Sequence, residues 1–119
     1  MCFINFLSYI ETLFLFYNII TKMIVISKTI LVEFGIKHSD AIEPLNRWYE
    51  KTKKADWKNF QKMKSTFNSV DTVGNDRYVF NIKGNDYRLV AMIFFNIRTV
   101  YVRFIGTHSE YNKIDCSNI

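Results

Sequence analysis

Four side chains near the C-terminal end of the sequence have the chemistry to act on a phosphodiester. Arg88 and Arg103 each stand inside an apolar run, and His108 and Tyr111 lie three residues apart directly after the second run. An unpaired guanidinium is costly to desolvate, so each Arg is expected to meet an anion. An arginine fork suits a phosphate, and both His and Tyr can transfer protons. The pattern therefore predicts phosphate binding combined with proton transfer.

A purely structural role for the same residues stays open. Each Arg could pair with a carboxylate of the chain (Asp76, Asp86 or Glu110) or lie exposed at a strand end. A single His is more often structural than catalytic, and His38 in its polar segment is assigned no role.

A basic segment adds a second candidate surface. Between Arg47 and Lys64 the chain has seven cations against Glu50 and Asp56. Cations in this number can neutralise RNA phosphates and release counterions, whereas a solvated helix face is the alternative. The aromatic residues of this segment follow an apolar stripe, so most of them are expected in the core rather than stacked on bases.

Length and composition exclude several classes of protein. With 119 residues, 49% of them hydrophobic and 23% charged, the chain is one folded domain rather than a disordered or low-complexity polypeptide. The net charge of +5 favours anionic partners such as nucleic acid. Cys2 and Cys116 stand at opposite ends, and the sequence has no HExxH, P-loop or dinucleotide motif. We expect no disulfide framework, no metal and no cofactor, and a reducing cytoplasm.

The first half of the chain predicts a strand followed by helices. A β-branched run at 23–26 ends at Ser27, a good helix N-cap. Asp40 with Glu43 resembles a capping box for a second helix, and Asp56 is expected to cap a third, shorter one. The second helix is expected to bury its apolar residues Ile42, Leu45, Trp48 and Tyr49.

From Val70 the hydrophobic period changes to two, which predicts strands. A turn at 74–76 precedes a strand at 77–83, and two further strands follow at 87–95 and 99–105. The last two are apolar on both faces, so they belong inside the sheet with helices on at least one side. The fold class is α+β, with an N-terminal strand and two to three helices packed on an antiparallel β-meander.

Residues 1–22 differ in composition from the rest. Sixteen of them are Phe, Ile, Asn, Leu, Tyr or Lys, the amino acids with codons built from A and T alone. We therefore expect that 1–22 is a translated upstream extension and that the domain is 23–119, starting at Met23. A membrane segment is the alternative, but Glu11 near its centre would cost a few kcal/mol.

Three phrases of the domain resemble the HigB toxins of bacterial type II toxin–antitoxin modules. They are EPLNRWYEKTKKADW (43–57), VFNIKGNDYRLVAMIFF (79–95) and VYVRFIGTHSEYNKID (100–115), in which the THSEY ending is the most diagnostic piece. The resemblance runs from Met23 to Asp115. Asn68 stands where such sequences usually have Pro, and this departure concerns a loop.

The resemblance implies a RelE-like, metal-independent RNA endonuclease that cuts mRNA, commonly on the translating ribosome, and is neutralised by a cognate HigA-type helix-turn-helix antitoxin. Arg88, helped by Arg103, would hold the scissile phosphate while the RNA 2′-hydroxyl attacks it. His108 would protonate the 5′-oxygen, and Tyr111 would orient the substrate or assist the proton transfer. Flanking phosphates would be contacted by the basic residues Lys53, Lys54, Lys58 and Lys83.

Two rival functions come from other classes. ParE-type toxins share the RelE-like fold but lack the nuclease residues and act by binding DNA gyrase, and Arg88 with the His108/Tyr111 pair favours the nuclease. A membrane-anchored basic binding module would depend wholly on residues 1–22, and no membrane partner is expected.

Overall fold

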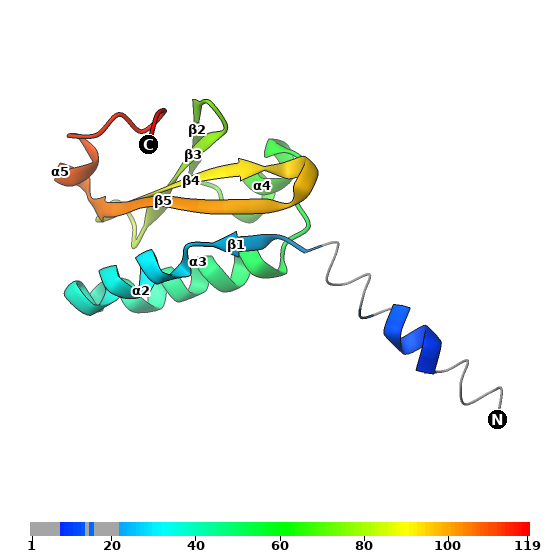
Figure 1. Cartoon of the computed structure of the whole chain (residues 1–119). Helices are drawn as coiled ribbons and strands as arrows, with labels where there is room; N and C mark the ends of the chain where they lie inside the picture. The colour runs from blue at the N-terminus through cyan, green and yellow to red at the C-terminus, as the bar shows by residue number, and fades with distance from the viewer. Residues whose placement is uncertain (1–7, 14, 16–21) are drawn as a thin grey trace.

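The structure is a computed structural model, and it describes residues 8–13, 15 and 22–119 (Figure 1). Its elements follow one another as β1 (Ile24–Ile26), α2 (Lys28–Lys37), the 3-10 turn η1 (Ser39–Ala41), α3 (Ile42–Lys54), α4 (Phe60–Thr66), β2 (Val70–Gly74), β3 (Arg77–Ile82), β4 (Tyr87–Phe94), the 3-10 turn η2 (Phe95–Ile97), β5 (Thr99–Thr107) and α5 (His108–Tyr111). This order confirms the predicted α+β fold.

The strands among the described residues form one sheet in the order β1-β5-β4-β3-β2. β1 runs parallel to β5, while β2 to β5 form an antiparallel meander. β3, β4 and β5 are the inner strands. The apolar residues on both faces of β4 and β5 predict this position for these two, because both faces of such a strand must be covered. Leu89 and Val90, neighbours that point to opposite faces, are both fully buried.

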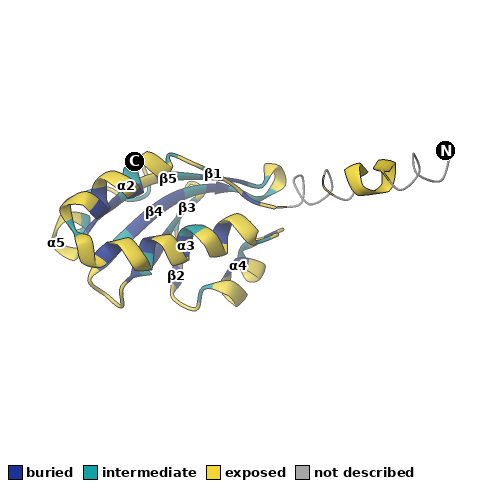
Figure 2. Ribbon diagram, turned by 90° about the horizontal axis from the view of Figure 1, so that it is seen from below, coloured by how far each residue is buried: buried dark blue, intermediate teal, exposed yellow. Residues whose placement is uncertain are grey.

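Helices α2 and α3 cover one face of the sheet, and their inner sides form the core with it (Figures 1 and 2). Leu45 and Trp48 of α3 are buried, and the Trp48 ring meets Phe80 of β3 edge to face, with centroids 5.4 Å apart. The expectation that Ile42 is buried was wrong: 44% of it is exposed. Ile42 begins α3, where its side chain lies against Gly35 of α2 at the rim of the helix pair.

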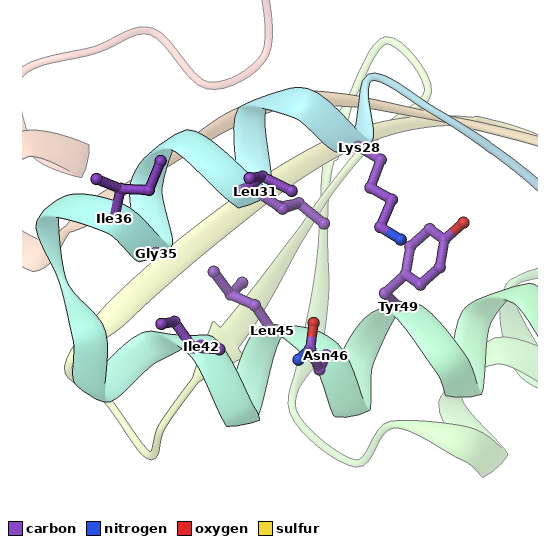
Figure 3. A pocket seen from close by; sticks show the side chains of 9 residues that line it. Lys28, Leu31, Gly35, Ile36, Ile42, Leu45, Asn46 and Tyr49 are labelled. Atoms are coloured by element: carbon purple, nitrogen blue, oxygen red, sulfur yellow. The ribbon is translucent and has the colours of Figure 1, made fainter.

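The two helices leave an apolar groove of about 190 Å³ between them (Figure 3). Leu31 and Leu45 line it, and Ile42 lies at one end. At the other end the Lys28 ammonium lies 4.4 Å from the centre of the Tyr49 ring (Figure 3). This contact explains why the Tyr49 ring is half-buried rather than part of the interior.

The helix caps differ from those that the sequence predicts. No side chain caps α3, because Asp40 instead accepts hydrogen bonds from the Tyr87 hydroxyl (2.6 Å) and the Lys83 ammonium (2.7 Å). These two bonds favour the charged form and hold the pKa of Asp40 below its ordinary value. Ser27 does stand at the N-cap of α2 but makes no capping hydrogen bond through its side chain.

The third helix also has a different cap. Asn59 accepts from the backbone N–H of Lys62 (2.9 Å) and caps α4, whereas Asp56 forms an ion pair with Arg98. Trp57 therefore precedes the helix, where it is buried and donates to the Thr66 hydroxyl (3.0 Å).

The other face of the sheet is covered in part by the C-terminal segment. Figure 1 shows α5 and the residues after it on the side of the sheet away from α2 and α3. Arg77 of β3 donates from Nε and Nη2 to the backbone oxygen of Ile119 (3.0 and 2.7 Å), and Asn75 donates to the backbone oxygen of Ser117 (3.0 Å). The segment is thus tied to the β2–β3 turn.

At the other end of the chain, Met23 is part of the folded domain. Its side chain is buried in the core, and its backbone N–H donates to the carbonyl of Ala55 (3.0 Å). The predicted upstream extension 1–22 lies mostly outside the described residues, and the start at Met23 remains a proposal. None of the helices within the described residues is long and apolar enough to cross a membrane.

Candidate active site

Arg88 lies on β4 and faces away from the helices. Its neighbours Tyr87 and Leu89 belong to the core, so alternation along the strand directs Arg88 to the opposite face. It pairs in register with Asn81 of β3 and Gly106 of β5. Nε of Arg88 is buried and has no hydrogen-bond partner, and among the described residues no carboxylate forms an ion pair with this side chain. Within the described part of the chain the two Nη groups make no hydrogen bond either, and they remain the donors available to a ligand.

Tyr111 meets Arg88 from the helix that follows β5. The Cζ atom of Arg88 lies 5.6 Å from the centre of the Tyr111 ring, a cation–π distance. A capping box begins this helix: Thr107 Oγ1 accepts from the N–H of Glu110 (3.2 Å), and the Glu110 carboxylate accepts from the N–H of Thr107 (2.9 Å). Glu110 therefore caps a helix rather than pairing with an arginine. The hydrogen bonds with Thr107 lower the pKa of the Glu110 carboxyl.

The Tyr111 hydroxyl is held in its protonated form. Burial, a hydrogen bond to Cys116 Sγ (3.4 Å) and the nearby Asp71 carboxylate raise the pKa of Tyr111 to about 12, against a smaller opposing effect of Arg88. A phenol with this pKa is neutral at physiological pH. It can donate a hydrogen bond or a proton there, but it does not act as a base.

His108 begins α5 and is exposed. Its Nδ1 lies 3.2 Å from the amide nitrogen of Asn112, one turn further along. An amide that donates to Nδ1 leaves the proton of a neutral imidazole on Nε2. The arrangement gives His108 one ring nitrogen free to face a ligand.

Arg103 is exposed, which was one of the alternatives that the sequence left open. The register of β4 and β5 shifts between Val90 and Ala91, opposite Phe104 and Val102, so Arg103 is the extra residue of a β-bulge. A bulged residue lacks a direct partner on the neighbouring strand. Because Arg103 is exposed, it needs no anion of the chain.

Comparison with known proteins decides the family. Residues 41–114 match the model of the RelE-like toxic component of a toxin–antitoxin system, and this range includes Arg88, Arg103, His108 and Tyr111. The chain belongs to the HigB toxin family. The resemblance drawn from the sequence phrases is thereby confirmed.

Individual relatives agree with this assignment. The mRNA interferase toxin HigB of Escherichia coli K12 is 41% identical over 54 residues, which cover 44% of this chain and 52% of the relative. The chain thus spans about half of that relative's length. The mRNA interferase HigB of E. coli O6:H1 is 30% identical over 94 residues, which cover 77% of this chain and 91% of the relative.

The basic residues predicted to bind RNA lie apart on this HigB fold. Lys53 and Lys54 end α3, where Lys54 approaches Glu50 at 3.9 Å and Lys53 lies 5.9 Å from the centre of the Tyr49 ring. Lys58 is exposed before α4. Lys83 lies in the β3–β4 turn with Asp40 and Asp86 as partners, at 2.7 and 3.6 Å. All four remain on the surface.

Two neighbours of Tyr111 were missed by sequence reasoning. Asp71 belongs to β2 and affects the pKa of Tyr111 through its charge, and Cys116 contacts the Tyr111 hydroxyl. No local motif joins 71, 111 and 116. Gly106 was also missed: a Cβ atom there would lie 2.5 Å from Cζ of Phe104 and 3.2 Å from Cβ of Glu110, so its lack of a side chain lets α5 pack beside Arg88.

Proposed function

We propose that this HigB-family chain is an mRNA endoribonuclease toxin whose site is built on Arg88 and Tyr111. The single observation that carries the proposal is the Arg88 guanidinium, which lies over the Tyr111 ring at 5.6 Å without a carboxylate partner among the described residues. An arginine with unused donors is suited to a phosphate oxygen. The names of the relatives, both mRNA interferases, support the same substrate.

The reaction uses the nucleophile that RNA itself carries. The 2′-hydroxyl attacks the adjacent phosphorus, the bond from phosphorus to the 5′-oxygen breaks, and the products are a 2′,3′-cyclic phosphate and a 5′-hydroxyl. Negative charge builds on the non-bridging oxygens in the transition state. Arg88 stabilises this charge, and Arg103 at the bulge adds a second positive charge.

Proton transfer is assigned to α5. The imidazolium form of His108 donates a proton from Nε2 to the departing 5′-oxygen, and Asn112 orients the ring by turning its amide oxygen toward the Nδ1–H of this form. Tyr111 acts as a neutral hydrogen-bond donor because its pKa is about 12. The proton of the 2′-hydroxyl passes to a general base, which is either the Asp71 carboxylate or a substrate-bound water.

The proposed partners follow from the family. The substrate is mRNA on the translating ribosome in the cytoplasm, flanking phosphates contact Lys53, Lys54, Lys58 and Lys83, and a HigA-type helix-turn-helix antitoxin neutralises the toxin. The reaction needs no metal or cofactor.

A substrate with one changed atom tests the proposal. A message carrying a single 2′-deoxyribose at a mapped cleavage position should resist cleavage there and remain cleavable elsewhere. Cleavage at the 2′-deoxy position would reject the attack of the 2′-hydroxyl. Inhibition of DNA gyrase with all messages intact would favour the ParE-type alternative.

A further inference from the structure

A second pocket lies at the outer edge of β3, on the α3 side of the sheet, whereas Arg88 points to the opposite face. The pocket has a volume of about 210 Å³ between α3, the residue that follows α4, and the end of β3. The side chains that matter here are Arg47, Trp48, Lys51, Phe67, Asn81 and Lys83. Lys83 belongs to the four basic residues predicted to contact flanking phosphates, and Arg47 and Lys51 belong to the basic segment 47–64 that the sequence offers as a phosphate-binding surface.

The pocket is lined by cations without a lining carboxylate. Arg47, Lys51 and Lys83 all line it. Arg47 reaches Glu43 only at 3.9 Å with both side chains largely exposed, and such a pair contributes little. Lys83 does pair with Asp40. The Asp40 carboxylate, however, lines a neighbouring pocket that shares Arg47 and Lys83 with this one. Lys51 forms no ion pair within the described part of the chain and lies 6.0 Å from the centre of the Phe67 ring.

The pocket also holds an unused polar group. Trp48 is only 2% exposed, yet its indole N–H has no hydrogen-bond partner. Trp48 lines the pocket, so its indole N–H resonance reports on a ligand that occupies it. Trp57, the second tryptophan, differs because its indole N–H is bonded to Thr66.

The edge of β3 is open at this point. Pairing of β2 with β3 begins at Val70 and Phe80, so Asn81 and Ile82 pair only with β4. Asn81 is the register partner of Arg88. Neighbouring strands lie about 4.8 Å apart, so the wall of the pocket is one strand away from the proposed phosphate-binding arginine.

We propose that this pocket binds the phosphate and sugar of a nucleotide close to the scissile bond of single-stranded RNA. This inference rests on the proposed function. The phosphate lies among Arg47, Lys51 and Lys83, and the strand passes around the open edge of β3 to reach Arg88. The Asn81 amide offers a donor and an acceptor to a ribose hydroxyl or a base edge. Adjacency to Arg88 favours RNA over an acidic protein segment as the occupant.

The two tryptophans provide a direct test in the full chain. A single-stranded hexanucleotide RNA with every 2′-hydroxyl methylated cannot be cleaved and is titrated into ¹⁵N-labelled protein. We expect the indole N–H resonance of Trp48 to shift and saturate, while that of Trp57 stays in place. A shift of neither or of Trp57 alone would overturn the proposal.

Paired variants separate the pocket from general charge. R47Q/K51Q removes two cations from the pocket, and K62Q/K64Q removes two exposed cations from α4. The first should weaken binding of the hexanucleotide about tenfold and reduce the salt slope by roughly 1.4, since each phosphate contact on a single strand contributes about 0.7. The control should change affinity less than about threefold. Equal losses in both variants would contradict a defined pocket.

Failure of this inference is distinguishable from failure of the proposed function. If the Trp48 resonance does not shift but Arg88→Ala abolishes cleavage, the nuclease proposal is supported and the pocket proposal is rejected. If the Trp48 resonance shifts and Arg88→Ala cleaves at the parent rate, RNA binding in the pocket is supported and the catalytic role of Arg88 is rejected. A hexaglutamate peptide that shifts Trp48 when the RNA does not would overturn the proposal in favour of a protein partner.

Discussion

The guanidinium carbon of Arg88 lies 5.6 Å from the centre of the Tyr111 ring, so an inner strand and the short C-terminal helix share one charged surface. The Thr107–Glu110 capping box and Gly106 determine where α5 lies relative to the strand. Together Arg88 and Tyr111 present a cation beside a protonated phenol.

Replacing Arg88 by Met should separate stability from activity. The substitution removes a buried donor that has no partner and keeps the length of the side chain. We expect the free energy of unfolding, measured with urea, to stay equal or rise by up to about 1 kcal/mol, because no hydrogen bond is lost. Cleavage should fall by about 10²–10³-fold, as for loss of a group that stabilises transition-state charge. A clear loss of stability would show that Arg88 has a structural role.

Two substitutions of Tyr111 should differ in effect. Tyr111→Phe keeps the ring under Arg88 and removes only the hydroxyl, whereas Tyr111→Ala removes both, so the Ala variant should lose more activity. Because the pKa of Tyr111 is about 12, the phenol is protonated throughout pH 6 to 9.5. The ratio of wild-type to Tyr111→Phe cleavage rates should therefore be constant over that range. A ratio that changes with pH would show that the Tyr111 hydroxyl changes its protonation state within this range.

His108 is tested against its own neighbour. His108→Ala should stay folded and lose about 10²–10⁴ in rate, the usual contribution of general acid–base catalysis. Asn112→Ala should lose less, and its activity should depend on pH differently because Nδ1 no longer has a fixed hydrogen-bond partner. If folded His108→Ala cleaves at the rate of the parent protein, His108 has a structural role and not a catalytic one.

The Asp40 cluster predicts a dependence of stability on pH. Hydrogen bonds from Lys83 and Tyr87 lower the pKa of Asp40 in the folded state, so its contribution is fully present above pH about 4. It is lost as the pH falls below that value, through the folded pKa. Asp40→Asn should therefore be less stable than the parent at pH 7, and the difference should shrink between pH 4 and pH 2 in urea titrations. A difference independent of pH would contradict the ion pair with Lys83.

The proposed start at Met23 has a simple check. Mass spectrometry of the toxin from its native cells should find an N-terminal peptide that begins at Met23. Recovery of peptides from within 1–22 would reject the proposal.

The fold was largely predictable because the spacing of apolar residues along the sequence indicates which face of a helix or strand is buried. The apolar faces of β4 and β5 required inner positions, and Trp48 and Trp57 on the apolar stripe are buried as expected. The helix caps were not predictable from local pattern. The carboxylate of Asp40 binds Tyr87, 47 residues away, and such a distant partner outweighs a local capping position.

The candidate site was only partly predictable for the same reason. Arg88 and Tyr111 stand out by residue type in the sequence, and the structure brings them together. Asp71 and Cys116 reach Tyr111 through sheet register and the path of the C-terminal segment, which no local spacing encodes. The sequence could not decide between an exposed Arg103 and one that meets an anion, because the β-bulge at which Arg103 lies exposed depends on the register of β4 and β5.

The chemistry of the cut ends tests the central claim most directly. Message from translating ribosomes, incubated with the parent protein or with Arg88→Ala, is analysed by mass spectrometry for the groups on the new 3′ and 5′ ends. The account predicts 2′,3′-cyclic or 3′-phosphate with 5′-hydroxyl ends from the parent protein and a loss of these ends with folded Arg88→Ala. Ends carrying a 3′-hydroxyl and a 5′-phosphate, or the same cyclic ends at the same rate from Arg88→Ala, would contradict it.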